Sequence, residues 1–260
     1  MKSRLTTLKR ALSRAGAVLR RNFGKVTYKQ KSRADLVTVA DLESQRVILD
    51  EIRRAFPGDD YKAEEDAVKL TGAEHLWLID PLDGTTNYAH SYPASCVSIG
   101  VLRRGAPALG GVYDPSRDEL FLAEKGKGAT MNGRRLRVTK TRRVADSLLI
   151  TGFAYDRAER ADYYLARFKS FLIRAHDVRR SGSAALDLAW LAAGRADGFW
   201  EFGLNPWDVA AGWLLVLEAG GTVTDFAGRP WKALADMGAR TLATNGRLHA
   251  EMLAVLRRTR

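Results

Sequence analysis

The chain of 260 residues is 46% hydrophobic and 28% charged, which excludes an extended disordered or collagen-like chain and predicts one large domain or two small ones around a shared core. Lys and Arg number 42 against 30 Asp and Glu, and the net charge of +12 favours anionic ligands such as phosphate esters, nucleic acid or acidic lipid. Because the basic residues occur in short scattered pairs, we favour a solvated surface over a dedicated nucleic-acid patch.

Cys96 is the only cysteine, so no intramolecular disulfide can form and a reducing compartment is expected. Its apolar neighbours favour a small buried thiol over a nucleophile. No stretch contains the ~20 apolar residues that a membrane helix needs. We therefore expect a cytoplasmic protein without a membrane partner.

The first part of the chain predicts two helices. Apolar residues of segment 1–23 fall on one helical stripe. Its basic composition would also suit a transit peptide or a surface-binding helix, and we favour an ordinary helix packed on the core. A short apolar extension follows at 35–37, where Thr38 can cap a second helix that Phe56-Pro57-Gly58 ends.

Short apolar runs separated by turn residues predict an antiparallel meander in the middle of the chain. A buried strand over 76–79 should end at Asp80-Pro81, because proline cannot donate to a β-ladder. Three further strands are expected at 96–102, 109–113 and 119–123.

From about residue 147 the pattern changes to alternating strands and helices. The expected elements are a strand at 147–151, helices at 160–173 and 183–193, a strand at 197–201, a helix at 206–218, strands at 222–225 and 241–244, and a helix at 248–257. We thus predict an α+β half over 1–145 and an α/β half over 146–260. No flexible linker separates them, so the functional site should lie between halves that share an interface.

The segment Asp80-Pro81-Leu82-Asp83-Gly84-Thr85-Thr86-Asn87 concentrates groups that suit phosphate chemistry. Two carboxylates three residues apart repel one another unless a cation or protons intervene, and magnesium prefers oxygen ligands. Beyond Gly84 the chain could enter a helix, whose free backbone N–H groups would face a bound phosphate. The same residue types also form ordinary tight turns and helix caps, so this segment alone leaves both interpretations open.

Two further acidic clusters weaken the turn interpretation. Glu64-Glu65-Asp66 follows the second predicted helix, and Trp207-Asp208 opens a later one, where an aspartate is also a common N-terminal charge. These clusters, the central segment and Asn205-Pro206-Trp207-Asp208-Val209-Ala210-Ala211-Gly212 together resemble the inositol monophosphatase family. The resemblance extends from about Lys31 to Gly246 and includes segments 125–129, 132–133 and 218–221.

The resemblance implies a layered α-β-α-β-α sandwich of the inositol monophosphatase/fructose bisphosphatase type, usually a homodimer. The metal ligands it implies, for two or three Mg²⁺ ions, are Glu64, Asp80, the Leu82 carbonyl, Asp83 and Asp208. Asp80 would bridge two ions, which can activate a water and stabilise the leaving alkoxide of an in-line displacement. The N-terminal half would thus carry the metal and phosphate motifs, and the C-terminal half the last metal ligand and the substrate contacts.

Catalytic roles follow from the same resemblance. Glu64 and Thr85 would orient the attacking water, and Asp41 would hydrogen-bond Thr85 in a proton relay. An acid at the N-terminus of a helix is an equal alternative for Asp41. The family's Gly-Glu-Glu is Ala63-Glu64-Glu65 here, and alanine has poor access to positive φ, so the loop could take another path.

The resemblance also assigns the substrate contacts. Gly84, Thr85 and Thr86 would receive the phosphate, while Asp208 and the segment Gly182-Ser183-Ala184 would contact the polyol. Glu201 would accept hydrogen bonds from vicinal hydroxyls, or could be an ordinary surface acid at a strand end.

The expected activity is Mg²⁺-dependent hydrolysis of myo-inositol monophosphate or a similar polyol or sugar monophosphate, since Thr86-Asn87-Tyr88 resembles the inositol phosphatase branch. Alternatives within the superfamily are phosphatases for 3′-phosphoadenosine 5′-phosphate, histidinol phosphate, fructose bisphosphate or nicotinamide dinucleotide phosphate. A function of another class is an accessory role in transcription or ribosomal RNA maturation through polymerase or RNA binding, which only the positive charge supports.

Overall fold

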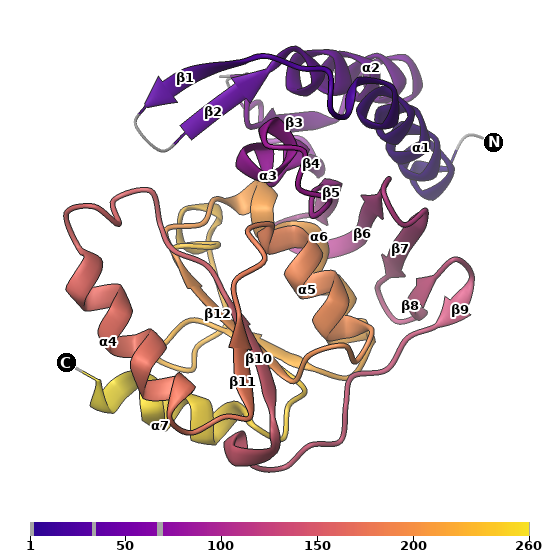
Figure 1. The fold of residues 1–260 in the computed structure, drawn as a ribbon. Coiled ribbons are helices and arrows are strands. Elements are labelled where there is room, and N and C mark those ends of the chain that lie inside the picture. Colours follow the sequence, from indigo (N-terminus) through magenta and orange to yellow (C-terminus); the bar gives the residue numbers. More distant parts are fainter. Residues whose placement is uncertain (1–2, 33–34, 67–69, 260) are drawn as a thin grey trace.

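The computed structural model describes residues 3–32, 35–66 and 70–259 as alternating layers of helices and sheets (Figure 1). The helices α1 (Arg4–Asn22) and α2 (Val39–Ala55) cover one face of a seven-stranded sheet. Between this sheet and a five-stranded sheet lie α5 (Ala184–Ala192) and α6 (Pro206–Glu218). The outer face of the second sheet packs against α4 (Ala161–Leu172) and α7 (His249–Arg258). This order confirms the predicted α-β-α-β-α sandwich.

The seven-stranded sheet has the order β3-β4-β5-β6-β7-β8-β9. Its strands are β3 (Asp60–Ala63), β4 (His75–Asp83), β5 (Cys96–Arg103), β6 (Ala106–Asp114), β7 (Glu119–Glu124), β8 (Gly128–Met131) and β9 (Arg134–Arg135). All neighbours are antiparallel except β3 and β4, which run parallel. The predicted meander is therefore confirmed as β5 to β7.

The five-stranded sheet has the order β11-β10-β12-β14-β13. Its strands are β10 (Leu148–Thr151), β11 (Asp177–Arg179), β12 (Gly198–Phe202), β13 (Thr222–Thr224) and β14 (Arg240–Thr244). β10 runs parallel to both of its neighbours, whereas β14 is antiparallel to β12 and β13. Smaller elements are the hairpin β1 (Tyr28–Ser32) and β2 (Asp35–Thr38), the short helix α3 (Thr85–Ala89) and the 3₁₀ turns Val144–Asp146 and Leu234–Asp236.

One predicted boundary is wrong. The strand β4 does not end at Asp80-Pro81 but continues to Asp83. Its pairing with β5 shifts between Asp80 and Asp83, so Pro81 lies where the ladder is already irregular and the missing N–H leaves no regular bond unmade. The irregularity thus lies within β4, between its two aspartates.

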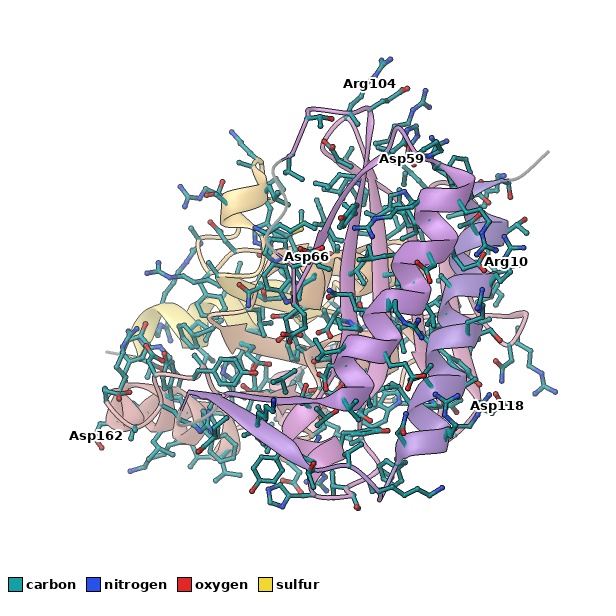
Figure 2. The ribbon with its side chains drawn as sticks, turned by 90° about the horizontal axis from the view of Figure 1, so that it is seen from above. Arg10, Asp59, Asp66, Arg104, Asp118 and Asp162 are labelled. Carbon is teal, nitrogen blue, oxygen red and sulfur yellow. The ribbon has the colours of Figure 1, made fainter. Side chains whose placement is uncertain are left out.

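The N-terminal segment is an ordinary packed helix, as favoured above. Leu8, Leu12 and Leu19 of α1 are fully buried, and Figure 2 shows α1 and α2 side by side, with Arg10 at their outer edge. From α1, Arg10 and Arg14 both pair with the buried Glu51 of α2, Arg10 at 2.6 Å. Within the described residues, no helix has the length and apolar character needed to cross a membrane.

Gly16 gives a test of how tightly α1 packs on the sheet. A Cβ at this position would overlap the ring of Tyr113 on β6. Gly16→Ala should therefore lower the free energy of unfolding in urea, because overpacking costs about 1–3 kcal/mol, against about 1 kcal/mol gained in helix propensity. Gly58→Ala, which meets no atom within 4 Å, is the control and should change little. A more stable Gly16→Ala protein would contradict this packing.

Candidate active site

The residues in the irregular part of β4 are held by local hydrogen bonds. The backbone N–H of Leu82 donates to Asp80 Oδ1 at 3.0 Å, and Ser44 Oγ on α2 donates to the Pro81 carbonyl at 2.7 Å. Gly84 then has φ +87°, and a Cβ there would lie 2.8 Å from the Ala94 carbonyl oxygen, so only glycine fits. This turn starts α3 at Thr85, so the helix that the sequence allowed beyond Gly84 is present.

A pocket opens at this turn, with walls from both halves of the chain. Its lining residues are Glu64, Asp80, Leu82, Asp83, Gly84, Thr85, Thr86, Phe153, Ala154, Tyr155, Arg157, Arg180, Gly182, Ala184, Glu201, Phe202, Gly203, Leu204, Asn205 and Asp208. The side chains or backbone of all the proposed metal ligands are therefore in one cavity. Of the other predicted site residues, Asp41 and Ser183 do not line the pocket. Each is hydrogen-bonded to a residue that does, Asp41 to Thr85 and Ser183 to Asp83.

The carboxylates in this pocket raise one another's pKa. Burial raises the pKa of Asp80 well above its usual value, and the charges of three neighbouring acids, Glu64 first, add to this shift. The pKa of Asp208 is raised likewise by burial and then by Asp83. Folding has thus concentrated negative charge that protons or a cation must relieve.

These acids suit a hard divalent cation by their chemistry, because carboxylate and carbonyl oxygens are the preferred ligands of magnesium. Within residues 3–32, 35–66 and 70–259, however, no three or more His, Cys, Asp and Glu side chains stand as a ready-made shell for a metal. Asp83 and Asp208 each use one carboxylate oxygen to accept a backbone N–H at the start of a helix. Asp208 Oδ2 accepts the Asn205 N–H at 2.7 Å, in a capping box at the start of α6.

Asp83 joins the two halves of the chain. Its Oδ2 accepts the Ser183 hydroxyl at 2.6 Å and the Ala185 N–H at 2.7 Å, at the start of α5. Burial raises the pKa of Asp83 in spite of these bonds. Ser183, predicted to contact substrate, is 1% exposed and holds Asp83 in place.

The partly buried Thr85 and the buried Asp41 form a hydrogen-bonded unit. The Thr85 hydroxyl lies 3.1 Å from Asp41 Oδ1 and 2.9 Å from the Leu82 carbonyl oxygen. It has one hydrogen and can donate to only one of them at a time. Asp41 also closes the capping box of α2, accepting from the backbone N–H of Thr38 at 2.8 Å. Both sequence interpretations of Asp41, helix-end acid and partner of Thr85, are therefore compatible with this one position.

The loop before Glu64 needs no glycine. Ala63 lies at the end of β3, paired in parallel with Ile79, and is not among the described residues with positive φ. Glu64 continues from this strand, its N–H donating to the Ile79 carbonyl at 3.2 Å. The departure from the family's Gly-Glu-Glu thus leaves Glu64 on the pocket wall.

Comparison with known proteins identifies the family. A model described as "Inositol monophosphatase family" matches residues 1–260. The chain belongs to the inositol monophosphatase family. It is 47% identical to an inositol-1-monophosphatase of Synechocystis sp. over 96% of this chain and 87% of that one. It is also 45% identical to the Nus factor SuhB of Salmonella typhimurium, over 86% of this chain and 85% of the relative.

Solved structures agree with this assignment. The inositol monophosphatase of Anabaena superposes with a TM-score of 0.89 at 47% identity, covering 98% of this chain and 95% of that chain. A structure described as IMPase/NADP phosphatase complexed with Mg²⁺ and phosphate superposes with a TM-score of 0.84 at 25% identity, covering 96% and 94%. The inositol monophosphatase family consists of metal-dependent phosphatases, so the acidic pocket is where its chemistry is expected.

Two further buried acids lie at the C-terminal side of this inositol monophosphatase family pocket, Glu201 in its wall and Asp187 behind it. Glu201 is 8% exposed and Asp187 is 1% exposed, so Glu201 is not a surface acid. Burial raises the pKa of Glu201 to about 8, with a further increase from Asp187 and a decrease from Arg180. Ser181 Oγ donates to Asp187 Oδ1. A Cβ on Gly152 would overlap the Glu201 carboxylate, so the glycine makes room for it.

Four residues of the site were not identified from the sequence. Asp187 and Arg180 act on Glu201, and Arg157 lines the pocket. Asn87 Nδ2 donates to the carbonyls of Ala94 and Ser181, which ties α3 to the wall behind Glu201. Asn87 belongs to the recognised motif and could have been found from it. The other three are single charged residues on a loop or helix, and nothing else in the sequence marks them as site residues.

Proposed function

We propose that this chain is a Mg²⁺-dependent phosphomonoesterase that hydrolyses myo-inositol monophosphate or a similar small polyol or sugar monophosphate. The observation that carries the proposal is the meeting of Glu64, Asp80, Asp83 and Asp208 in one pocket beside the Thr85–Asp41 unit. Membership of the inositol monophosphatase family and the 47% identity to an inositol-1-monophosphatase support the substrate class.

Two or three Mg²⁺ ions would be held by Glu64, Asp80, the Leu82 carbonyl, Asp83 and Asp208. Bound there, the ions supply an activated water and charge stabilisation for the leaving oxygen. The structure with Mg²⁺ and phosphate, at 25% identity, supports the choice of metal. Asp83 would contribute to this ligand set while its Oδ2 keeps the hydrogen bonds from Ser183 and Ala185.

Residues of the chain then position the reactants. The Thr85 hydroxyl would accept a hydrogen bond from the water while donating its own hydrogen to the ionised Asp41, and would orient the water together with Glu64. Gly84 and Thr86 flank the expected phosphate position with backbone N–H groups. This arrangement needs no covalent intermediate on the protein.

The polyol would lie against the C-terminal wall. Gly182 and Ala184 line the pocket there, and Glu201 and Asp208 present carboxyl groups for substrate hydroxyls. A cytoplasmic homodimer completes the proposal. The family resemblance supports the dimer, and the single buried thiol of Cys96 suits a reducing compartment.

Phosphate release from a panel of esters tests the proposal. The panel contains myo-inositol 1-phosphate, fructose 1,6-bisphosphate, 3′-phosphoadenosine 5′-phosphate and histidinol phosphate, each with Mg²⁺ and with EDTA. We expect the highest kcat/KM for the inositol ester and no release in EDTA. Preference for the nucleotide or for histidinol phosphate would move the chain to another branch of the superfamily, and release independent of Mg²⁺ would reject the mechanism.

A second candidate function follows from the SuhB relatives, which are described as Nus factors, and from the charge of +12. We propose RNA or transcription-complex binding as an additional role that does not need the acidic pocket. Retention of labelled ribosomal leader RNA should then fall steeply with added salt and persist in Asp83→Asn. Absence of retained RNA at low salt would reject this role.

A further inference from the structure

Two arginines, Arg157 and Arg180, line the active-site pocket. Arg157 lies in the loop between β10 and α4, is half-buried, and lines the pocket that contains the acids. Its backbone N–H donates to the Ala154 carbonyl at 3.1 Å. Within the part of the chain that the structure describes, its guanidinium has no hydrogen bond and no ion pair with another residue.

Neighbouring arginines on the same segment are engaged. Arg160 pairs with Asp156 at 3.3 Å and lies over the ring of Tyr163. Arg167 donates to the Tyr163 carbonyl at 2.8 Å and lies over the same ring. Arg157 therefore differs from these arginines both in facing the pocket and in keeping its donors free.

The other arginine of the pocket, Arg180, also has no ion pair within the described residues, but its charge acts on the buried acids of the C-terminal wall. Arg180 lowers the pKa of both Glu201 and Asp187, so its charge already opposes theirs. Arg157, in contrast, forms no ion pair with Glu201 or Asp187, and its charge is available to a ligand in the pocket.

We propose that Arg157 binds a second anionic group where a phosphate ester has one, so that of two esters otherwise alike the pocket favours the one with another phosphate or a carboxylate away from the reacting phosphate. This inference rests on the proposed function, which places the reacting phosphate at Gly84–Thr86. Arg157 comes from the loop that begins at Gly152, where Glu201 packs, and so belongs to the substrate-facing wall. A guanidinium is suited to both anions because its parallel N–H groups match their oxygen pairs.

Two pairs of substrates separate the second anion from the rest of the molecule. Fructose 1,6-bisphosphate is compared with fructose 1-phosphate, and 6-phosphogluconate with glucitol 6-phosphate. The second pair contains one phosphate ester in each member and differs only in carboxylate against hydroxymethyl. The two pairs together distinguish a site for phosphate from a site for any anion.

We expect the wild-type protein to favour the member with the second anion in at least one pair by about tenfold in kcat/KM. Arg157→Ala should abolish the preference, Arg157→Lys should keep part of it, and added salt should reduce it in the wild type. Arg160→Ala removes the same charge from the same segment outside the pocket and should keep the preference, which excludes long-range attraction as its cause.

Several outcomes would overturn the inference. These are a wild-type protein without preference in either pair, an Arg157→Ala protein that keeps it, or equal losses in Arg157→Ala and Arg160→Ala. If Arg157→Ala does not fold, as judged by its thermal unfolding, Arg157→Gln gives the same comparison with a side chain of similar length. Phosphate release from myo-inositol 1-phosphate but no preference would reject this inference alone, whereas release from none of the esters would reject the proposed function too.

Discussion

Asp80→Asn is expected to lower kcat/KM for myo-inositol 1-phosphate by about a thousandfold, since one ligand of a two-metal clamp should contribute several kcal/mol to transition-state stabilisation. Asparagine retains the Oδ1 that accepts the Leu82 N–H, so the irregular part of β4 should keep its structure. Asp146→Asn, which changes an exposed acid outside the pocket, is the matched control and should keep full activity. Wild-type rates in Asp80→Asn would reject the metal site.

The same substitution should stabilise the protein when Mg²⁺ is withheld. Because the folded state raises the pKa of Asp80, it binds a proton more tightly than the unfolded chain, whose aspartates titrate near pH 4. The favourable contribution of the protonated group is present below that pH and is lost as the pH rises through the raised pKa. In EDTA, the unfolding temperature of Asp80→Asn should thus fall less between pH 5 and 8 than that of the wild type. Mg²⁺ should raise the unfolding temperature of the wild type more than that of Asp80→Asn. An Asp80→Asn protein that loses stability as steeply as the wild type would contradict this account.

Thr85→Ala is expected to lower kcat by about a hundredfold or more, the usual range for lost proton-transfer and orienting groups, with little change in KM. The reason is that, within the residues that the structure describes, the Thr85 hydroxyl alone links the pocket to the buried Asp41 by a hydrogen bond. Thr85→Ser keeps that hydroxyl and should recover most of the rate. A Thr85→Ala protein as active as Thr85→Ser would show that the hydroxyl has no part in the reaction.

The pH profile tests the same unit independently. Burial raises the pKa of Asp41 to about 6. The ionised carboxylate can only accept a hydrogen bond from Thr85, whereas the protonated acid can also donate one. The rate should therefore rise with pH through about 6. In Asp41→Asn the overall rate should be low, and this rise with pH should be absent. If the rise persists unchanged in Asp41→Asn, it belongs to another titrating group.

Much of the fold follows from local chemistry in the sequence. Thr38 and Asp41 form the capping box that starts α2, and the helix 206–218 begins at a proline, so its bounds were predicted correctly. The strands that were missed are short or polar. β1 (Tyr28–Ser32) has no inner apolar face, and β9 (Arg134–Arg135) has two residues, so only their hydrogen-bonded partners identify them.

The site divides in the same way. Asp80 and Asp83 were found because they stand together in one motif with proline and glycine, and Glu64 and Asp208 because the order of acidic clusters resembles a family. Asp187 and Arg157 were missed, since a helical aspartate and a loop arginine are usually solvated. Their significance comes from burial against Glu201 and exposure to the pocket, which are properties of tertiary structure.

The link from Asp83 to α5 has a consequence for how activity appears during folding. The bond to Ser183 joins positions 100 residues apart in the sequence, and contacts of such separation form late because they must first close a long loop. A refolding chain can therefore complete both sheets before Asp83 has its final orientation. Recovery of catalysis should lag behind recovery of secondary structure, and the lag would measure the docking of one half of the chain on the other.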